Sequence, residues 1–387
     1  MSDMIYDETT GTLLIPAFEL PPMPARPGKQ DAVDAWSRLN HLVREFPWAS
    51  GYDATVWLTA LLTAIQRPTI AGPVPGFAFI GNKAGCGKGL AIDIIGLLVW
   101  GGPVPCSQYP KDQEEADKAT LALALGGIAA VHFDNLEEGS LYGNGAMDSA
   151  LTLTVRGGRL LGQNRWVKDV PLRPCWFLSG NNISPGKDAF RRWLPCNLKT
   201  DLENPHERKC EVSNLMIHVA EHRPEIIRDA LIIMKAWHVA GKPDHGMPPL
   251  GSFVDWDQQI RAVVWFATGN DCLHTQRQAT TDSPERIKKL ALIEAWKNLP
   301  CQDKGITAAE AVKMAKERVD PKDKNSPSIY PELASALLEL GWRGEIIDSN
   351  RLGCFIRGIR DENIGGFKFS RSENKGQNKV RWCVINV

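Results

Sequence analysis

The spacing of hydrophobic and polar positions divides the first 300 residues into helical and β segments. Residues 35–66 carry apolar side chains every three to four positions, as a helix does, and prolines end that unit. The apolar runs 77–80 and 128–133 are short enough for buried strands, and the run 90–100 between them predicts a helix. A β-rich stretch follows at 159–180, and 205–300 is mostly helical. This alternation predicts an α/β fold with a mostly parallel central sheet and helical flanking segments.

The last part of the chain has a different pattern. Three helical segments, within 307–319, 330–340 and 349–362, precede two short alternating segments that predict a β-hairpin. The order helix–helix–helix–hairpin is typical of a small winged-helix domain. Residues 1–34 contain the segment PPMPARPG and little apolar periodicity, so we expect an extended tail or linker there. The predicted domains are therefore 1–34, 35–300 and 301–387.

Composition and charge narrow the functional classes. The 45 Lys and Arg balance the 45 Asp and Glu, which excludes a generally basic, histone-like protein. Residues 342–387 nevertheless hold nine basic and five acidic residues, a local net charge of +4. Nine cysteines without any CxxC exclude a disulfide-rich secreted module and a zinc finger, and indicate reduced thiols in a cytoplasm. The absence of a long apolar run or a signal sequence predicts no membrane segment.

A glycine-rich loop, GNKAGCGKG (81–89), lies between a predicted strand and a predicted helix, which is the context of a phosphate-binding loop. Glycines let backbone N–H groups face a polyphosphate, and the helix adds its positive end. The match to the usual motif departs at both ends, because Asn82 takes the place of the first glycine and Gly89 that of the Mg²⁺-binding Ser or Thr. The expected ATP-binding residues are Gly81, Asn82, Gly85, Cys86, Gly87, Lys88 and Gly89. A turn that binds nothing is the alternative.

Two further apolar segments end in polar residues. Asp134 follows a buried strand and is the expected Mg²⁺ ligand, with Asn135 where a catalytic Glu is usual. Glu137 and Glu138 lie just beyond and are expected to orient or activate water. Asn181 and Asn182 end another strand and are expected to contact the γ-phosphate or the attacking water. The alternative for these residues is a local Asx turn. The paired arginines Arg191 and Arg192 follow, as trans-acting arginine fingers or as a solvated face.

Taken together, these segments resemble the AAA+ ATPase module of replication helicases from phages, plasmids and integrated elements, which is similar to superfamily-three helicases. The resemblance rests on residues 77–96, 131–139, 159–182, 188–198 and 203–208, and extends to flanking helices at 46–68 and 251–271. It covers roughly residues 40–300. In many relatives the module follows a primase or primase-polymerase domain. A 34-residue tail would leave no room for one, so we expect either a stand-alone helicase or a fragment of a longer polypeptide.

The resemblance implies a role for individual residues of these motifs. Lys88 would be the Walker A lysine, Asp134 the Walker B aspartate, and Asn181 or Asn182 the sensor-1 residue. Arg191 or Arg192 would reach the nucleotide of a neighbouring subunit, in the ring of six copies that the resemblance implies. Gly89 and Asn135 depart from the family pattern, so Mg²⁺ binding and water activation are expected to differ and hydrolysis to be slow.

Two regions are candidates for contact with DNA. The segment before Asn181 would form a hairpin in the ring channel, with Arg165 and Lys168 on phosphates and Trp166 stacked on a base; an ordinary hairpin with a buried tryptophan is the alternative. In the C-terminal domain, duplex DNA would meet Asn350, Arg351, Arg357, Arg360, Lys375 and Lys379; a closing domain that only docks to the ATPase or to a partner is the alternative. The expected activity is an ATP-dependent DNA helicase. A DNA-binding initiator or loader with a weak ATPase, and a remodeller that does not bind DNA, are the alternatives.

Overall fold

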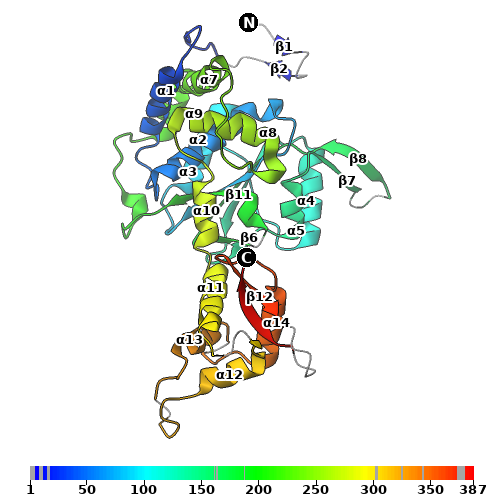
Figure 1. The fold of residues 1–387 in the computed structure, drawn as a ribbon. Helices are drawn as coiled ribbons and strands as arrows, with labels where there is room; N and C mark the ends of the chain where they lie inside the picture. Colours follow the sequence, from blue (N-terminus) through cyan, green and yellow to red (C-terminus); the bar gives the residue numbers. More distant parts are fainter. Residues whose placement is uncertain are drawn as a thin grey trace. The chain divides into compact units, whose positions relative to one another are not determined.

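The computed structural model describes residues 5–7, 12–14, 18–160, 162, 164–186, 188–300, 304–323, 326–341, 344–372 and 380–387. Contacts between residues group the chain into two compact units, Met1–Ala279 and Thr280–Val387 (Figure 1). No helix among these described residues is long and apolar enough to cross a membrane.

A five-stranded sheet forms the centre of the first unit. Its strands are β3 (Gly76–Gly81), β4 (Cys106–Ser107), β5 (Ala130–Leu136), β9 (Cys175–Asn181) and β11 (Trp193–Leu198). They lie in the order β11-β3-β9-β5-β4, and every neighbouring pair is parallel. The predicted mostly parallel α/β sheet is therefore confirmed. Because the strands are parallel, the polar residues that end β3, β5 and β9 meet at one edge.

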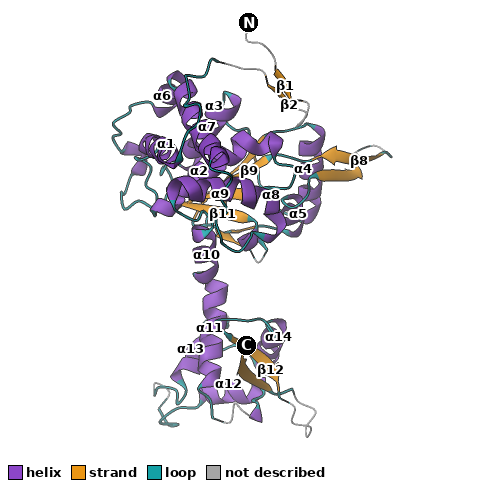
Figure 2. Ribbon diagram, turned by 45° about the horizontal axis from the view of Figure 1, so that its top comes forward, coloured by secondary structure: helices purple, strands orange, loops and turns teal. Residues whose placement is uncertain are grey.

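Helices cover both faces of this sheet (Figure 2). On one face, Phe77 and Phe79 pack with α2 (Gly51–Gln66) and α3 (Lys88–Trp100). On the other face, Ala78 belongs to a separate cluster with α4 (Gln113–Leu125) and α5 (Gly145–Ala150). Alternate residues of a strand point to opposite faces, so a strand that is apolar throughout can serve both clusters.

The remaining elements of the first unit complete these layers. Helix α1 begins at Lys29, where the Asp31 carboxylate accepts a hydrogen bond from the Gly28 N–H over 2.7 Å. The predicted tail 1–34 thus includes the first turns of a helix as well as two short strands. The other elements are β1 (Ile5–Asp7), β2 (Thr12–Leu14), η1 (Arg67–Thr69), β6 (Leu141–Tyr142), β7 (Val155–Arg159), β8 (Trp166–Pro171), β10 (Ser184–Pro185), η2 (Ala189–Arg191), η3 (Pro205–Glu207), α6 (Leu215–Glu221), α7 (Arg223–Val239), η4 (Gly251–Phe253), α8 (Val254–Trp256), η5 (Asp257–Arg261), α9 (Ala262–Thr268) and α10 (His274–Thr281).

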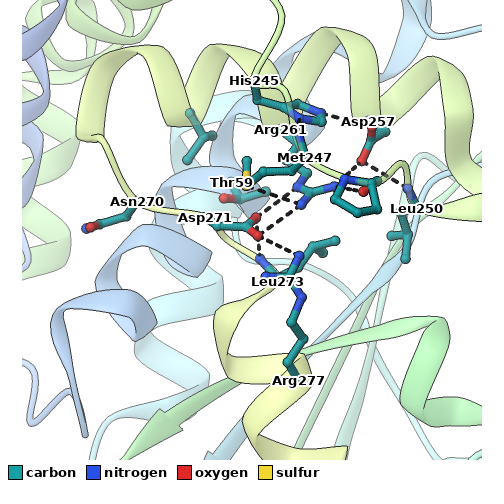
Figure 3. A network of polar contacts seen from close by, with 12 residues as sticks. Thr59, His245, Met247, Leu250, Asp257, Arg261, Asn270, Asp271, Leu273 and Arg277 are labelled. Carbon is teal, nitrogen blue, oxygen red and sulfur yellow. Dashed lines mark hydrogen bonds and ion pairs between the residues drawn. The ribbon is translucent and has the colours of Figure 1, made fainter.

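A fully buried arginine, Arg261, lies in the π-helical turn η5 behind the sheet (Figure 3). Its guanidinium donates to both oxygens of Asp271 at 2.8 and 2.9 Å and to Oδ1 of Asp257 at 2.8 Å. Asp257 also accepts from the Leu250 N–H and contacts His245 at 3.0 Å. A buried cation requires such partners, because an unpaired charge loses its hydration without compensation.

The second unit has its own hydrophobic core. Helices α11 (Pro284–Lys297), α12 (Ala308–Lys316), α13 (Pro331–Glu339) and α14 (Ser349–Gly358) precede the antiparallel strands β12 (Phe367–Arg371) and β13 (Trp382–Asn386). The order of helices and strands in 307–387 is the predicted one. Helix α11 differs from the prediction, which placed it in the ATPase domain: Trp296 is fully buried and packs edge-on against Phe369. The second unit therefore begins at Thr280 and not at residue 301.

Candidate nucleotide site and nucleic-acid interface

The glycine-rich loop connects the end of β3 to the start of α3, as predicted. Gly85 and Gly87 have φ values of 77° and 100°, which side-chain-bearing residues rarely adopt. A Cβ on Gly81 would lie 2.5 Å from Sγ of Cys86 and 3.0 Å from Nζ of Lys88. Gly89 differs, because a Cβ there would meet no heavy atom within 4 Å. Three of the glycines thus fix a tight loop, and the fourth leaves open space at the helix start.

Asn82, which replaces the first glycine of the usual motif, anchors this loop to the neighbouring strand. Its Nδ2 donates to the Thr200 carbonyl oxygen over 2.8 Å, and its Oδ1 accepts from the Thr200 N–H over 3.0 Å. Lys83 donates to the Leu202 carbonyl oxygen over 2.9 Å. The departure from the motif is therefore a structural anchor between the loop and the segment after β11.

Lys88, the first residue of α3, reaches the end of β9. Its Nζ donates to Oδ1 of Asn181 over 2.6 Å and lies 3.4 Å from the Lys83 carbonyl oxygen. Among the described residues no carboxylate lies within ion-pair distance of Lys88. Its charge is held by neutral acceptors, which an anionic phosphate would outcompete. The structure thus brings together the predicted lysine and one of the two predicted asparagines.

Asp134 is held by residues that the sequence reasoning missed. Its Oδ1 accepts a hydrogen bond from the Ser179 hydroxyl, and Ser179 Oγ lies 3.1 Å from Nε2 of buried His132. His132 Nε2 is also 3.6 Å from Oδ1 of Asp134, and burial lowers the His132 pKa. The sequence did contain a signal for this contact. His132 and Asp134 are two residues apart on β5, as are Ser179 and Asn181 on the adjacent strand β9, so the members of each pair lie on the same face of the sheet.

An irregularity in β5 shapes the residues around Asp134. The register with β9 shifts between Phe133 and Leu136, and Asn135 has a φ of 55° that asparagine tolerates better than most residues. The Asn135 N–H donates to Oδ1 of Asp134 over 2.8 Å, so a local turn accompanies the proposed ligand. This bulge leaves the Asp134 carboxylate half exposed and Asn135 exposed as well, whereas the other residues of β5 are buried.

Of the two acidic residues beyond this bulge, the structure brings Glu138 to the predicted asparagines. Glu138 Oε1 accepts from Asn182 Nδ2 over 2.7 Å, and the Asn182 N–H donates to the Gly81 carbonyl oxygen over 2.9 Å. Glu137 is exposed and lines, with Asp134 and Asn135, a cavity of about 940 Å³ beside β4 and β5. Glu138 is therefore the acid joined to the loop and β9, and Glu137 lies toward the cavity.

The residues present fit a nucleoside triphosphate with Mg²⁺. No group of three or more metal-ligating side chains occurs in the described part of the chain. Proteins commonly hold Mg²⁺ through one or two carboxylates and the substrate's own phosphates, and Asp134 supplies one carboxylate here. Asp134 would hold the ion, the backbone of Gly85–Lys88 and the Lys88 amino group would hold the phosphates, and Gly89 offers no hydroxyl to the ion.

A second cavity, of about 260 Å³, adjoins the loop on its other side. Gly85, Gly87 and Cys86 form one wall, and Phe46, Leu90 and Leu215 contribute apolar surface. His206 closes against the loop, with its Cβ 3.2 Å from the position of a Cβ on Gly85. Phe46 and His206 were not predicted as site residues, because nothing local in the sequence links residues so far from the loop.

The two neighbouring arginines have different surroundings. Arg191 is 64% exposed and lies 3.1 Å from the exposed Asp188. The Arg192 side chain is only 14% exposed and lies 3.8 Å from buried Asp148 and 3.6 Å from Asp188. Burial raises the pKa of Asp148 to about 6, and the nearby Arg192 opposes that rise. Arg192 is thus engaged within its own chain, and Arg191 is the more accessible of the pair.

The hairpin β7–β8 carries the predicted DNA-binding residues and extends away from α4 (Figures 1 and 2). Trp166 pairs with Arg159 across the hairpin and is 63% exposed, so the alternative of a buried tryptophan is wrong. Lys168 lies two residues further on the same strand, and both Lys168 and Arg165 are exposed. Trp166 and Lys168 are two residues apart on β8 and so point to the same face of the hairpin, with exposed Arg165 next to Trp166. Exposed aromatic and basic side chains together are the combination that binds single-stranded nucleic acid.

Of the predicted DNA-binding residues in the C-terminal unit, the structure describes Asn350, Arg351, Arg357 and Arg360. Arg351 begins α14 and lies 3.4 Å from the cap residue Asp348, and Arg357 is exposed near its end. Six residues of helix separate the two arginines by about 120° around the axis. Asn350 is exposed, and Arg360 donates to its neighbour Asp361. Lys375 and Lys379 lie outside the described residues.

Comparisons with known proteins give weak structural likenesses. No protein-family model matches the chain, and no curated protein matches its sequence. The apo structure of the NrS-1 C-terminal region is 13% identical, with a TM-score of 0.39, and covers 100% of this chain and 83% of the other. A structure of JCV helicase is 13% identical, with a TM-score of 0.25, and covers 69% and 71%. These low scores leave the function to be argued from the site itself.

Proposed function

We propose that this protein is an ATP-dependent DNA helicase. The observation that carries the proposal is the meeting of three separate motifs at the carboxyl edge of one parallel sheet. Lys88 at the start of α3 contacts Asn181 at the end of β9, and Asp134 at the end of β5 is bonded to Ser179 of β9. A cation for phosphates, a carboxylate for Mg²⁺ and an amide next to the lysine are the parts that phosphoryl transfer requires.

Each of these residues has a role in the proposed mechanism. The loop N–H groups and the Lys88 amino group bind the β- and γ-phosphates, and Lys88 exchanges Asn181 for a phosphate oxygen as the nucleotide enters. Mg²⁺, when bound, neutralises charge on the phosphates. Ser179 and His132 orient the Asp134 carboxylate that holds it. The apolar cavity of Phe46, Leu90 and Leu215 receives the base.

The β7–β8 hairpin provides the proposed contact with DNA. Exposed Trp166 stacks on bases and Arg165 and Lys168 contact phosphates. Repetition of this hairpin in a ring of identical subunits would multiply modest contacts, and exposed Arg191 would complete the site of the next subunit. We place this motor in replication of a phage, plasmid or integrated element, from the motif resemblance given above, with a primase or polymerase as a further partner.

The decisive experiment measures ATP hydrolysis and unwinding of a forked DNA by the protein and by Lys88→Ala. Unwinding that requires ATP and is lost in Lys88→Ala supports the helicase. DNA binding and slow ATPase without strand separation would support an initiator or loader. This outcome is worth testing because Gly89 and Asn135 depart from the usual motifs and are expected to slow hydrolysis. ATPase without any affinity for DNA would support a remodeller and end the helicase proposal. The mass of the assembly with ATP tests the ring.

A further inference from the structure

A cavity of about 460 Å³ opens at the edge of the sheet opposite the nucleotide site. Part of its lining comes from Gly127–Ala129, which directly precede β5, and from Pro171 and Arg173, which lie before β9. Arg67 of η1 and Trp100, the last residue of α3, complete it. Residues that precede parallel strands lie at their amino ends, so this cavity is separate from the loop at Lys88.

Arg67 is only 5% exposed, and none of the described carboxylates forms an ion pair with it. Its Nη1 donates to the Ile70 carbonyl oxygen over 2.9 Å, while its buried Nε has no hydrogen-bond acceptor among the described residues. Burial lowers its pKa to about 10, the neighbouring Cys175 raises it, and Arg173 lowers it further. Arg67 therefore stays charged at neutral pH, and the nearby charge adds repulsion.

The same unit shows how a buried arginine is otherwise accommodated. Arg261 is bonded to two carboxylates, Asp257 and Asp271 (Figure 3). Arg67 has a similar depth and one carbonyl bond. A buried guanidinium without a counter-ion carries a large desolvation cost. An anion in the cavity would remove this cost, and carboxylate and phosphate are the two groups that the planar guanidinium binds in bidentate geometry.

The rest of the lining favours a ligand with an apolar body. Trp100 is 37% exposed and Ile128 is 39% exposed, and both line this cavity, so they offer apolar surface to a ligand there. Arg173 is exposed and brings a second positive charge to the lining. The volume is within the range of small-molecule sites. We propose that this cavity binds a small organic carboxylate, whose charge pairs with Arg67 and Arg173 and whose apolar body contacts Trp100 and Ile128.

The test compares three probes by thermal unfolding of the whole protein at constant ionic strength: benzoate, its neutral isostere benzamide, and inorganic phosphate. Saturable stabilisation by benzoate, and by neither of the others, is expected. Equal stabilisation by benzamide would reduce the site to an apolar hollow and overturn the proposal. Equal stabilisation by phosphate would overturn the apolar contact, and no effect of benzoate would overturn the whole.

Variants assign the effect to the cavity. Arg173→Ala, at an exposed position that should not affect folding, is expected to weaken benzoate binding about tenfold, the value of one charge-assisted contact. Arg26→Ala, another exposed arginine that does not line the cavity, is the matched control and should bind normally. Arg67→Met should abolish binding if it folds. Unchanged benzoate affinity in Arg173→Ala would show that the anion binds elsewhere.

Discussion

The amino group of Lys88 donates a hydrogen bond of 2.6 Å to Oδ1 of Asn181, which joins the first residue of α3 to the last residue of β9. The two residues are 93 positions apart in the chain. Their contact places a mobile positive charge beside a neutral amide at the edge of the sheet where the proposed phosphates bind. An incoming phosphate can replace the amide without breaking an ion pair, so nucleotide binding need not overcome a competing carboxylate.

Lys88→Ala should reduce ATP hydrolysis to background and leave the fold intact. The lysine contacts polar groups at the edge of the sheet and is not part of either apolar cluster in this unit. Steady-state phosphate release and circular dichroism of the variant check the two halves of this prediction. Lys242→Ala, which removes an exposed lysine outside the loop, is the matched control. Normal turnover by Lys88→Ala would remove the nucleotide site from this loop.

Gly89→Thr should increase Mg²⁺-dependent turnover. A Cβ at this position meets nothing within 4 Å, so the residue fits, and its hydroxyl supplies the ligand that this loop lacks. Turnover is measured against Mg²⁺ concentration, with Gly89→Val as a control of similar shape but without a hydroxyl. The same turnover in both variants would mean that the added hydroxyl does not reach the ion.

Arg191→Ala should act across a subunit interface, whereas Arg192→Ala should act mainly on its own subunit. Arg191 is largely exposed, and Arg192 is enclosed beside Asp148. Loss of a trans-acting arginine costs about a thousandfold or more in turnover. Mixing Arg191→Ala with Lys88→Ala should restore part of the ATPase, because some interfaces then pair an intact loop with an intact arginine. Mixed assemblies without any recovery would contradict a role in trans.

Arg165→Ala/Lys168→Ala should weaken binding to single-stranded DNA and abolish unwinding, while basal ATPase survives. Both side chains are exposed on the β7–β8 hairpin, away from the Lys88 loop. Each lost phosphate contact should reduce the slope of log affinity against log salt by about one unit. Affinity is measured at several salt concentrations, with Lys118→Ala on the neighbouring helix α4 as control. A loss of ATPase with unchanged DNA affinity would instead make these residues structural.

Asp148 should make the stability of the protein depend on pH. Burial raises its folded pKa from 3.8 to about 6, and its buried Oδ1 has no hydrogen-bond partner among the described residues. Between these values the folded protein binds more protons than the unfolded chain, so this contribution to stability falls as the pH rises through the window. Converted fully into free energy of unfolding, this pKa shift corresponds to about 3 kcal/mol.

Asp148→Asn should remove this component of the pH dependence. Urea unfolding of the wild type and of the variant is compared at about pH 4 and about pH 7. The wild type should lose more stability than Asp148→Asn between the two conditions. An identical loss in both proteins would mean that Asp148 is charged throughout the range.

Local pattern alone determined the elements that carry the proposed site. Glycines and a lysine between an apolar strand and an apolar helix predicted the loop at 81–89, and apolar runs ending in Asp134 and Asn181 predicted two strands of the sheet. These features depend on backbone conformation and on the burial period of each segment, both of which are written in neighbouring residues. The parallel sheet followed from the alternation of strands and helices.

Only the tertiary structure decided which of these residues meet. Strand order placed β9 between β3 and β5, and so joined Asn181 to Lys88 and Ser179 to Asp134. Packing also assigned α11 to the second unit, because Trp296 finds its apolar partner in Phe369. Nothing in the sequence around Arg67 distinguishes it from the other arginines of the chain. Its burial without a carboxylate arises from contacts between distant segments, which no local pattern specifies.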